Sequence, residues 1–254
     1  INGLRQIGVP VISEIEFASQ YTEAMLIGIT GSNGKTTTTM LTHHLIGSEK
    51  DGVGMAGNIG DSFAKMVAEE DHGLYVLEIS SFQLDGVLKF KPKVAVITNI
   101  TPDHLDRYDY QFERYIASKF RIAMNQDSND YLIYDADDEV IGSWLQKHPV
   151  QSKLVPFSVK KTLEYGAWLE DRTIHIRTEH NILKMSTDFL TLEGQHNVKN
   201  AMAASLASLL VNVRKEAILQ SIQSFQGVPH RLEKVLKINH RSEERRVGKE
   251  CRSR

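Results

Sequence analysis

The segment that most constrains the fold is residues 28–37, which read Gly-Ile-Thr-Gly-Ser-Asn-Gly-Lys-Thr-Thr. An apolar run at residues 25–29 leads into it, and a helix-like stretch at residues 37–45 follows. A buried strand, a glycine loop and a helix in this order are typical of a phosphate-binding loop, because the N–H groups and the dipole of the helix start attract an anion. We expect Lys35 to reach the outer phosphates of a nucleotide and Thr36 to offer its hydroxyl to magnesium.

The loop departs from the common phosphate-loop pattern G-x-x-x-x-G-K-[ST], which would need glycine at position 29, where isoleucine stands. The alternative interpretation is an ordinary glycine and asparagine turn before a helix. We favour ATP binding, because the strand, the loop and the helix all fall where that function needs them. The expected ATP-binding residues of the loop are Gly31, Ser32, Asn33, Gly34, Lys35, Thr36 and Thr37.

Apolar runs with strand character alternate with helix-like stretches along most of the chain. The alternation predicts an α/β fold with a mostly parallel sheet covered by helices on both faces, and ligands then bind beyond the carboxyl ends of the strands. The expected strands are 7–12, 25–29, 52–56, 74–79, 94–98, 131–134 and 154–157, and the expected helices are 14–20, 37–45, 61–70, 81–88, 111–124, 139–147, 197–210 and 214–225. Short alternating runs at 167–170, 173–177 and 182–185 predict a small antiparallel sheet.

Charge and cysteine content narrow the class of protein. The chain has 30 Lys and Arg residues against 32 Asp and Glu residues, so its balance indicates neither nucleic-acid nor membrane binding. No apolar run approaches the ~20 residues of a membrane-spanning helix. The single cysteine, Cys251, excludes an internal disulfide framework and suits a reducing cytoplasm.

Both ends of the chain differ from the rest. The first residue is Ile1 rather than methionine, which indicates a missing start. Residues 241–254 are rich in charge and have no apolar period, and they resemble the in-frame translation of a sequencing-adapter oligonucleotide. We expect this tail to be non-native and to pack against nothing. The alternative is a natural basic tail.

Polar residues that could carry chemistry follow two of the expected strands. Glu78 lies near the end of the apolar run 74–79, where a bare carboxylate is unfavourable unless it is paired or bound to a metal. Residues 98–108 read Thr-Asn-Ile-Thr-Pro-Asp-His-Leu-Asp-Arg-Tyr and place His104 among carboxylates, as a metal site would require. The alternative for Glu78 is a structural glutamate in a salt bridge, and the alternative for residues 98–108 is a turn that caps a helix.

Three further positions have both a functional and a structural interpretation. Lys119 lies on the apolar face of the expected helix 111–124, where a lysine commonly extends its charge to the surface. His196 and Asn200 share one face of a helix start. Arg231 follows a Gly/Pro turn. Helix capping and an ordinary loop charge are the alternatives for the last two.

Taken together, these motifs resemble the Mur ligase family of peptidoglycan synthesis. Within the family, residues 77–84 (Leu-Glu-Ile-Ser-Ser-Phe-Gln-Leu) with residues 99–108 look like the members that add D-glutamate to UDP-N-acetylmuramoyl-L-alanine. The resemblance implies a central ATP-binding domain at 22–240, preceded at 1–21 by the remnant of a domain that binds the UDP sugar. The C-terminal domain that binds the amino acid would be missing, which puts activity of this chain alone in doubt.

The resemblance also implies a role for each matching residue. Lys35 would contact the ATP phosphates, Thr36 and Glu78 would hold one Mg²⁺, and His104 with a carbamylated Lys119 would serve a second Mg²⁺. His196, Asn197 and Asn200 would face the adenine nucleotide, and Arg231 its phosphates. Asn58 would face the substrate, and Ser80 and Ser81 would lie near the muramoyl group. Lys35, Glu78, His104 and Lys119 would be the catalytic residues.

The implied reaction is ATP-dependent formation of an amide through an acyl phosphate, in a cytoplasmic, monomeric enzyme that binds neither membrane nor nucleic acid. Two alternatives stay open. One is another ligase of the superfamily, such as a folylpolyglutamate synthase, against which the Ser-Ser-Phe-Gln segment argues. The other is an ATP-binding module without ligase chemistry, against which the set of carboxylate, histidine and lysine argues.

Overall fold

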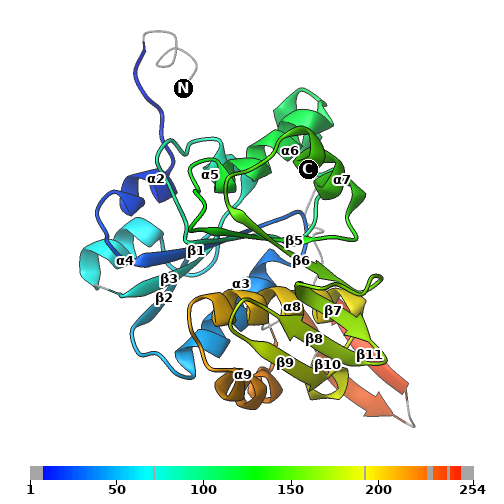
Figure 1. Cartoon of the computed structure of the whole chain (residues 1–254). Helices are drawn as coiled ribbons and strands as arrows, with labels where there is room; N and C mark the ends of the chain where they lie inside the picture. The colour runs from blue at the N-terminus through cyan, green and yellow to red at the C-terminus, as the bar shows by residue number, and fades with distance from the viewer. Residues whose placement is uncertain (1–7, 71, 192, 228–230, 239–240, 247–254) are drawn as a thin grey trace.

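The structure is a computed structural model of the chain, and it describes residues 8–70, 72–191, 193–227, 231–238 and 241–246 (Figure 1). A nine-stranded sheet of order β2-β3-β1-β4-β5-β6-β7-β8-β9 lies at its centre. Its strands are β1 (Met25–Thr30), β2 (Val53–Gly57), β3 (Leu74–Glu78), β4 (Val94–Ile97), β5 (Tyr131–Asp135), β6 (Lys153–Ser158), β7 (Gly166–Glu170), β8 (Thr173–Arg177) and β9 (Ile182–Ser186).

All neighbours from β2 to β7 pair in parallel, and β8 and β9 continue the sheet antiparallel. The α/β class, with a mostly parallel sheet and an antiparallel part, is thus confirmed. The small antiparallel sheet expected from the sequence is present, but it is continuous with the main sheet. Strand β7 pairs with β6 through Phe157 with Ala167 and Ser158 with Trp168.

Helices cover both faces of the sheet (Figure 1). Helices α3, α8 and α9 pack on one face and α2, α4, α5, α6 and α7 on the other, each group with its own apolar cluster. The α-helices are α2 (Glu14–Ser19), α3 (Lys35–Gly47), α4 (Phe63–Glu69), α5 (Ser81–Leu84), α6 (Phe112–Phe120), α7 (Glu139–Lys147), α8 (Gln195–Leu210) and α9 (Lys215–Ser221). The 3₁₀ turns are η1 (Leu105–Tyr108), η2 (Arg121–Ala123), η3 (Thr187–Phe189) and η4 (Ile222–Ser224).

The side-chain alternation of β1 shows how the strand serves both layers. Ile27 and Ile29 belong to the cluster with α3 and α8, whereas Leu26 belongs to the cluster on the opposite face. Gly28 also faces that second layer, since a Cβ there would lie 3.2 Å from Ile122 Cδ1. The central strand is therefore buried on both sides, which is why it reads as a continuous apolar run.

Two expected elements differ in the structure. Residues 8–12 form no strand, because their part of the described chain has no neighbouring strand to pair with; residue 7 lies outside the description. The helix expected at 81–88 ends at Leu84. Gly86 then lies against Ser13, whose N–H donates to the Gly86 carbonyl at 2.9 Å, and this contact turns the chain away from a helical path.

The C-terminal segment forms a two-stranded antiparallel ribbon, β10 (Arg231–Ile238) with β11 (Arg241–Arg246). The expectation that 241–254 packs against nothing is therefore wrong for 241–246. Backbone N–H and C=O groups make such a ladder whatever the side chains are, so composition alone misjudged this segment. Residues 247–254 lie outside the description.

A buried carboxylate fastens α2 to the sheet layer. Glu16 is fully buried, and its two oxygens accept the backbone N–H groups of Leu88, Lys89 and Phe90 at 2.8–3.0 Å. Burial alone would raise the pKa of Glu16, but these N–H groups, with the Gln20 amide, outweigh it and hold the pKa below its ordinary value. The charged form of Glu16 is thus the one that the fold stabilises.

We expect Glu16→Gln to lower the free energy of unfolding by at least about 2 kcal/mol, because the new amide NH₂ would face backbone donors and leave one or more unpaired. Because the folded-state pKa is lowered, this contribution is present above the ordinary glutamate pKa and is lost as the pH falls through the folded-state value. Urea unfolding at pH 7 measures the effect, with the exposed Glu23→Gln as control. Equal stabilities of the two variants would contradict the expectation.

Candidate nucleotide and metal site

The glycine loop connects β1 to α3 and brings the backbone close to its neighbours. Gly31 has φ +149° and Gly34 φ +82°, conformations that L side chains rarely adopt. A Cβ on Gly31 would lie 1.9 Å from Thr98 Oγ1, and one on Gly34 would lie 2.6 Å from Asn200 Oδ1. No side chain caps the start of α3 at Gly34. The helix start thus keeps the geometry expected of an anion-binding loop.

Residues that follow β4 hold the loop in shape. The Ser32 N–H donates to the Asn99 carbonyl at 2.9 Å, and the Asn33 N–H donates to Asn99 Oδ1 at 3.0 Å. Ser32 Oγ donates to the Thr101 carbonyl at 2.8 Å, and Thr98 Oγ1 donates to the Asn33 carbonyl at 2.7 Å. Thr98, Asn99 and Thr101 are not among the loop residues expected from the sequence; the available signal was their place in a polar run directly after an apolar strand.

Two lysines converge on one carbonyl of the loop. Lys35 Nζ donates to the Gly31 carbonyl at 2.9 Å and to the Ser32 carbonyl at 3.1 Å. Lys119 Nζ, from α6 on the other layer, donates to the same Gly31 carbonyl at 2.8 Å. Two ammonium groups beside one oxygen repel each other, and an anion bound at the loop would relieve that repulsion.

Lys119 is buried rather than extended to the surface. Its side chain is only 2% exposed, and Nζ lies 4.6 Å from the centre of the Tyr115 ring. Burial, aided by the charge of Lys35 and opposed by Asp103, lowers the pKa of Lys119 to about 7. A large share of this amine is therefore neutral at neutral pH, which makes it a nucleophile.

Glu78 lies at the carboxyl end of β3, next to the end of β1. It is 2% exposed, and Asn58 Nδ2 donates to its Oε1 at 3.0 Å. Its Oε2 is buried and has no hydrogen-bond partner among the residues that the structure describes. A buried carboxylate oxygen with one free coordination position suits a cation, and the adjacent loop places Thr36 at the start of α3.

His104 lies on the loop after β4 in a left-handed conformation, with φ 50°. Its side chain is half-exposed, its ring centroid lies 5.2 Å from that of Phe82, and Nε2 is 3.6 Å from Asp103 Oδ2. Among the described residues no three His, Cys, Asp or Glu side chains form a metal-binding group. Within the described part of the chain, side chains alone therefore do not assemble a second metal site around His104.

The start of α8 reaches the phosphate loop. Asn200 Oδ1 accepts from Thr38 Oγ1 at 3.2 Å, and Asn197 Oδ1 accepts from Asn200 Nδ2 at 3.3 Å. His196, which lies one helical turn before Asn200, is exposed. Asn200 therefore contacts α3 just after the loop, and Asn197 reaches it only through Asn200; a role in nucleotide binding stays a prediction for both residues. Arg231 begins β10, and the position of its side chain lies outside the description.

The residues expected near the substrate have structural partners. Asn58 bonds to Glu78 through both its side chain and its N–H, the latter to the Glu78 carbonyl at 2.8 Å. Ser80 caps α5 in a capping box with Gln83. Ser81 is buried, and its carbonyl accepts from Ser118 Oγ at 2.9 Å. This last bond ties α5 to α6 at the residue before Lys119.

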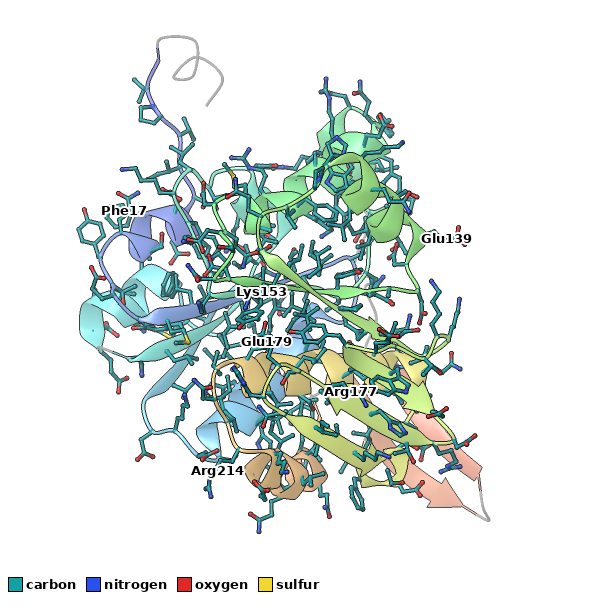
Figure 2. The ribbon with its side chains drawn as sticks, in the orientation of Figure 1. Phe17, Glu139, Lys153, Arg177, Glu179 and Arg214 are labelled. Carbon is teal, nitrogen blue, oxygen red and sulfur yellow. The ribbon has the colours of Figure 1, made fainter. Side chains whose placement is uncertain are left out.

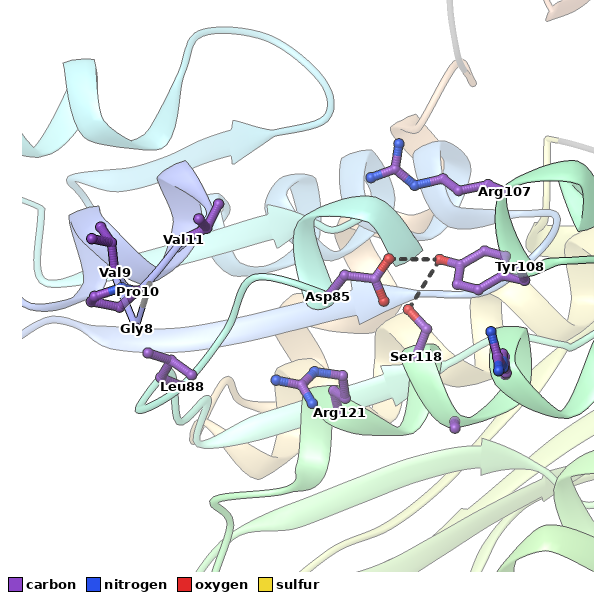
Figure 3. Close-up of a pocket in the computed structure, with 12 residues that line it drawn as sticks. Gly8, Val9, Pro10, Val11, Asp85, Leu88, Arg107, Tyr108, Ser118 and Arg121 are labelled. Atoms are coloured by element: carbon purple, nitrogen blue, oxygen red, sulfur yellow. Dashed lines mark hydrogen bonds between the residues drawn. The ribbon is translucent and has the colours of Figure 1, made fainter. Parts of the chain in front are cut away.

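A cavity of about 910 Å³ opens beside α5 and α6 (Figure 3). On its wall the Tyr108 hydroxyl lies within hydrogen-bonding distance of Asp85 Oδ2, at 3.1 Å, and of Ser118 Oγ, at 3.2 Å. The guanidinium groups of Arg107, Arg114 and Arg121 give the lining an excess of positive charge.

No described helix is long and apolar enough to cross a bilayer.

Comparison with known proteins gives consistent matches. The sequence pattern of the Mur ligase middle domain matches residues 29–208. The chain is 59% identical over 237 residues to the UDP-N-acetylmuramoylalanine--D-glutamate ligase of Christiangramia forsetii, covering 93% of this chain and 53% of that protein. It is 50% identical over 235 residues to the same-named protein of Bacteroides fragilis, covering 92% and 53%. The chain thus spans about half the length of the curated relatives it matches.

Solved structures agree on the fold. A UDP-N-acetylmuramoyl-L-alanyl-D-glutamate--2,6-diaminopimelate ligase superposes with a TM-score of 0.66 at 21% identity, covering 92% of this chain and 51% of that one. A murein peptide ligase from Psychrobacter arcticus superposes with a TM-score of 0.61 at 19% identity, covering 94% and 55%. At such identities the likeness concerns the fold alone.

Proposed function

The chain belongs to the Mur ligase family, and from this premise we propose that it is the ATP-binding part of a ligase that joins D-glutamate to UDP-N-acetylmuramoyl-L-alanine. The observation that carries the proposal is the loop at the start of α3, where Lys35 and Lys119 both bond to the Gly31 carbonyl. Such a concentration of positive charge at a helix start is suited to the phosphates of ATP.

The first Mg²⁺ would be held by Thr36 and Glu78. The buried, unpartnered Oε2 of Glu78 supports this assignment, because a carboxylate oxygen left bare in the interior is unfavourable unless a cation neutralises it. Bound there, the ion would supply charge neutralisation to the phosphates of ATP. Asn58, through its bond to Glu78 Oε1, would keep the carboxylate oriented.

The second Mg²⁺ would be served by His104 and Lys119, the lysine in its carbamylated form. The neutral amine adds to carbon dioxide, forming an N–C bond and releasing a proton, and the product is a carboxylate. This change would replace one of the two mutually repelling cations at Gly31 by an anion. The low pKa of Lys119 and its burial support the assignment.

The reaction then proceeds in two steps. The terminal carboxylate of the UDP-linked substrate attacks the γ-phosphorus of ATP, which gives an acyl phosphate and ADP. The amine of D-glutamate attacks the acyl carbon, phosphate leaves, and the amine loses a proton. Lys35 would stabilise the negative charge that develops on the transferred phosphoryl group.

The remaining assignments follow the same pattern. Asn200, which bonds to Thr38, and Asn197, which bonds to Asn200, would contact the adenine nucleotide together with His196, and Arg231 would contact its phosphates. Asn58, Ser80 and Ser81 would lie near the muramoyl part of the substrate. We propose a cytoplasmic, monomeric enzyme with no nucleic-acid or membrane partner, since the reaction draws on ATP and a nucleotide sugar.

A chimaera tests the proposal. Residues 8–238 of this chain replace the matching half of the Christiangramia forsetii relative, and phosphate release is measured with ATP and Mg²⁺. We expect turnover that requires both UDP-N-acetylmuramoyl-L-alanine and D-glutamate and that Lys35→Ala abolishes. A folded chimaera that binds ATP but turns over only with a folate and L-glutamate, or not at all, would contradict the proposal.

A further inference from the structure

One ion cluster outside the proposed reaction machinery joins the start of α8 to the sheet. Lys199 Nζ lies 2.7 Å from Asp135 Oδ2 and 3.1 Å from Asp137 Oδ2. The two carboxylate side chains are 5% and 1% exposed, and that of Lys199 is 22% exposed. We call these three residues the Lys199 cluster.

The cluster is rigidly held from the sheet side. Asp135 ends β5, and its Oδ1 accepts the Asp137 N–H at 2.9 Å. Asp137 accepts from Ser158 Oγ at 2.6 Å and from the Val159 N–H at 2.9 Å, both at the end of β6. The position of the two carboxylates is therefore fixed by the sheet and not by α8.

The residue after Lys199 is Asn200, which makes the contact with the phosphate loop. Successive residues of a helix point about 100° apart, so Lys199 and Asn200 fasten α8 in two different directions. Lys199 fastens it to Asp135 and Asp137 at the end of β5, and Asn200 fastens it to Thr38 by a hydrogen bond while lying close to Gly34, where a Cβ would be 2.6 Å from Asn200 Oδ1. Two such contacts from adjacent residues determine both the rotation of α8 about its axis and the distance of its first turn from the phosphate loop.

We propose that the Lys199 cluster is a positioning unit for nucleotide binding: Lys199 sets the first turn of α8 so that Asn200 meets the phosphate loop in its binding geometry. The inference rests on the proposed function, because it assumes that the loop takes ATP. Lys199 itself contacts no phosphate and acts through Asn200.

Nucleotide affinity gives the first test. The Lys199→Met chain keeps the length of the side chain and loses its charge, and we expect MgATP to bind it about tenfold more weakly, as when an outer partner of a functional group is removed. Lys199→Arg keeps the ion pair and should bind as the original chain does. The control is Lys153→Met, which breaks the exposed pair Lys153–Glu179 at 2.9 Å (Figure 2) and should leave MgATP affinity unchanged.

A double-mutant cycle separates positioning from general loss of stability. In an Asn200→Ala background the contact that Lys199 serves is gone, so Lys199→Met should weaken MgATP binding no further. Independent, additive losses in the cycle would overturn the inference. So would a Lys199→Met chain that is folded and binds MgATP normally.

Hydrogen exchange in the ligand-free chain keeps the inference testable if ATP is not the ligand. Lys199→Met should speed exchange of the amides at residues 31–38, whereas Lys153→Met should not. Unchanged exchange there would overturn the inference. Failure of the original chain to bind MgATP, with exchange altered as expected, would instead contradict the proposed function and leave the positioning role supported.

Discussion

Lys35→Ala is expected to weaken MgATP binding by this chain by about 10- to 100-fold, because one charge-assisted hydrogen bond to phosphate contributes about 1.5–3 kcal/mol. Lys35 Nζ donates to the Gly31 and Ser32 carbonyls, within the loop that would hold the phosphates. Isothermal titration calorimetry of folded variants measures the loss. The exposed Lys147→Ala on α7 is the control.

The fold of the Lys35 variant should be unaffected, since its ammonium is bonded to loop carbonyls and not buried in the core. The same thermal midpoint in the two variants is therefore part of the expected result. An unchanged dissociation constant for MgATP in Lys35→Ala would mean that the loop does not bind phosphate through this lysine.

The second large effect concerns Lys119. With a pKa of about 7, the amine is about half neutral at pH 7 and about one part in ten neutral at pH 6. Carbamylation needs the neutral amine. We therefore expect a carbamate signal in ¹³C NMR of the chain under ¹³CO₂ at pH 8, a weaker one at pH 6, and none in Lys119→Ala.

In the chimaera, Lys119→Ala should lower kcat by at least about 100-fold. Removing a residue that only supports a metal ligand lowers activity by up to about 100-fold, and here the ligand itself would be removed. Added short-chain carboxylates should restore part of the activity, since they can replace the missing anion. Near-normal kcat, with no carbamate signal in the original chain, would show that the buried amine has no such role.

Measurements of the free energy of unfolding distinguish a metal-ligand role of Lys119 from a role in stabilising the fold. Because the pKa of Lys119 is lowered on folding, the unfolded chain binds an extra proton between pH 7 and the ordinary lysine value, and raising the pH across that range stabilises the fold. Lys119→Met removes the buried charge and should be at least as stable as the original chain at pH 7. A strongly destabilised Lys119→Met would mean that the amine serves the fold.

Local patterns in the sequence predicted the parts of the site that local geometry controls. The strand, loop and helix around Lys35 were identified correctly, and the position of Glu78 at a strand end followed from its place after an apolar run. The carboxyl ends of parallel strands lie at one edge of their sheet, so the sequence also indicated that Glu78 lies near the loop of Lys35.

Contacts between distant segments could not be read in this way. Lys119 reaches Gly31 across 88 positions of sequence, and a pattern on one helix does not reveal which loop its side chain meets. The same holds for Lys199, whose partner Asp135 at the end of β5 lies 64 positions away. The union of the antiparallel strands with the main sheet depended on the short β6–β7 pairing, for which periodicity carries no signal.

The way the loop is assembled also bears on the order of folding. Strands β7, β8 and β9 form a local meander whose pairing closes only short loops, so it can form early. The phosphate loop depends on Thr98, Lys119 and Asn200, and its geometry exists only after the central sheet and both helix layers have docked. Recovery of MgATP binding after dilution from denaturant should therefore lag behind recovery of strand signal, which makes the nucleotide a kinetic reporter of the last folding step.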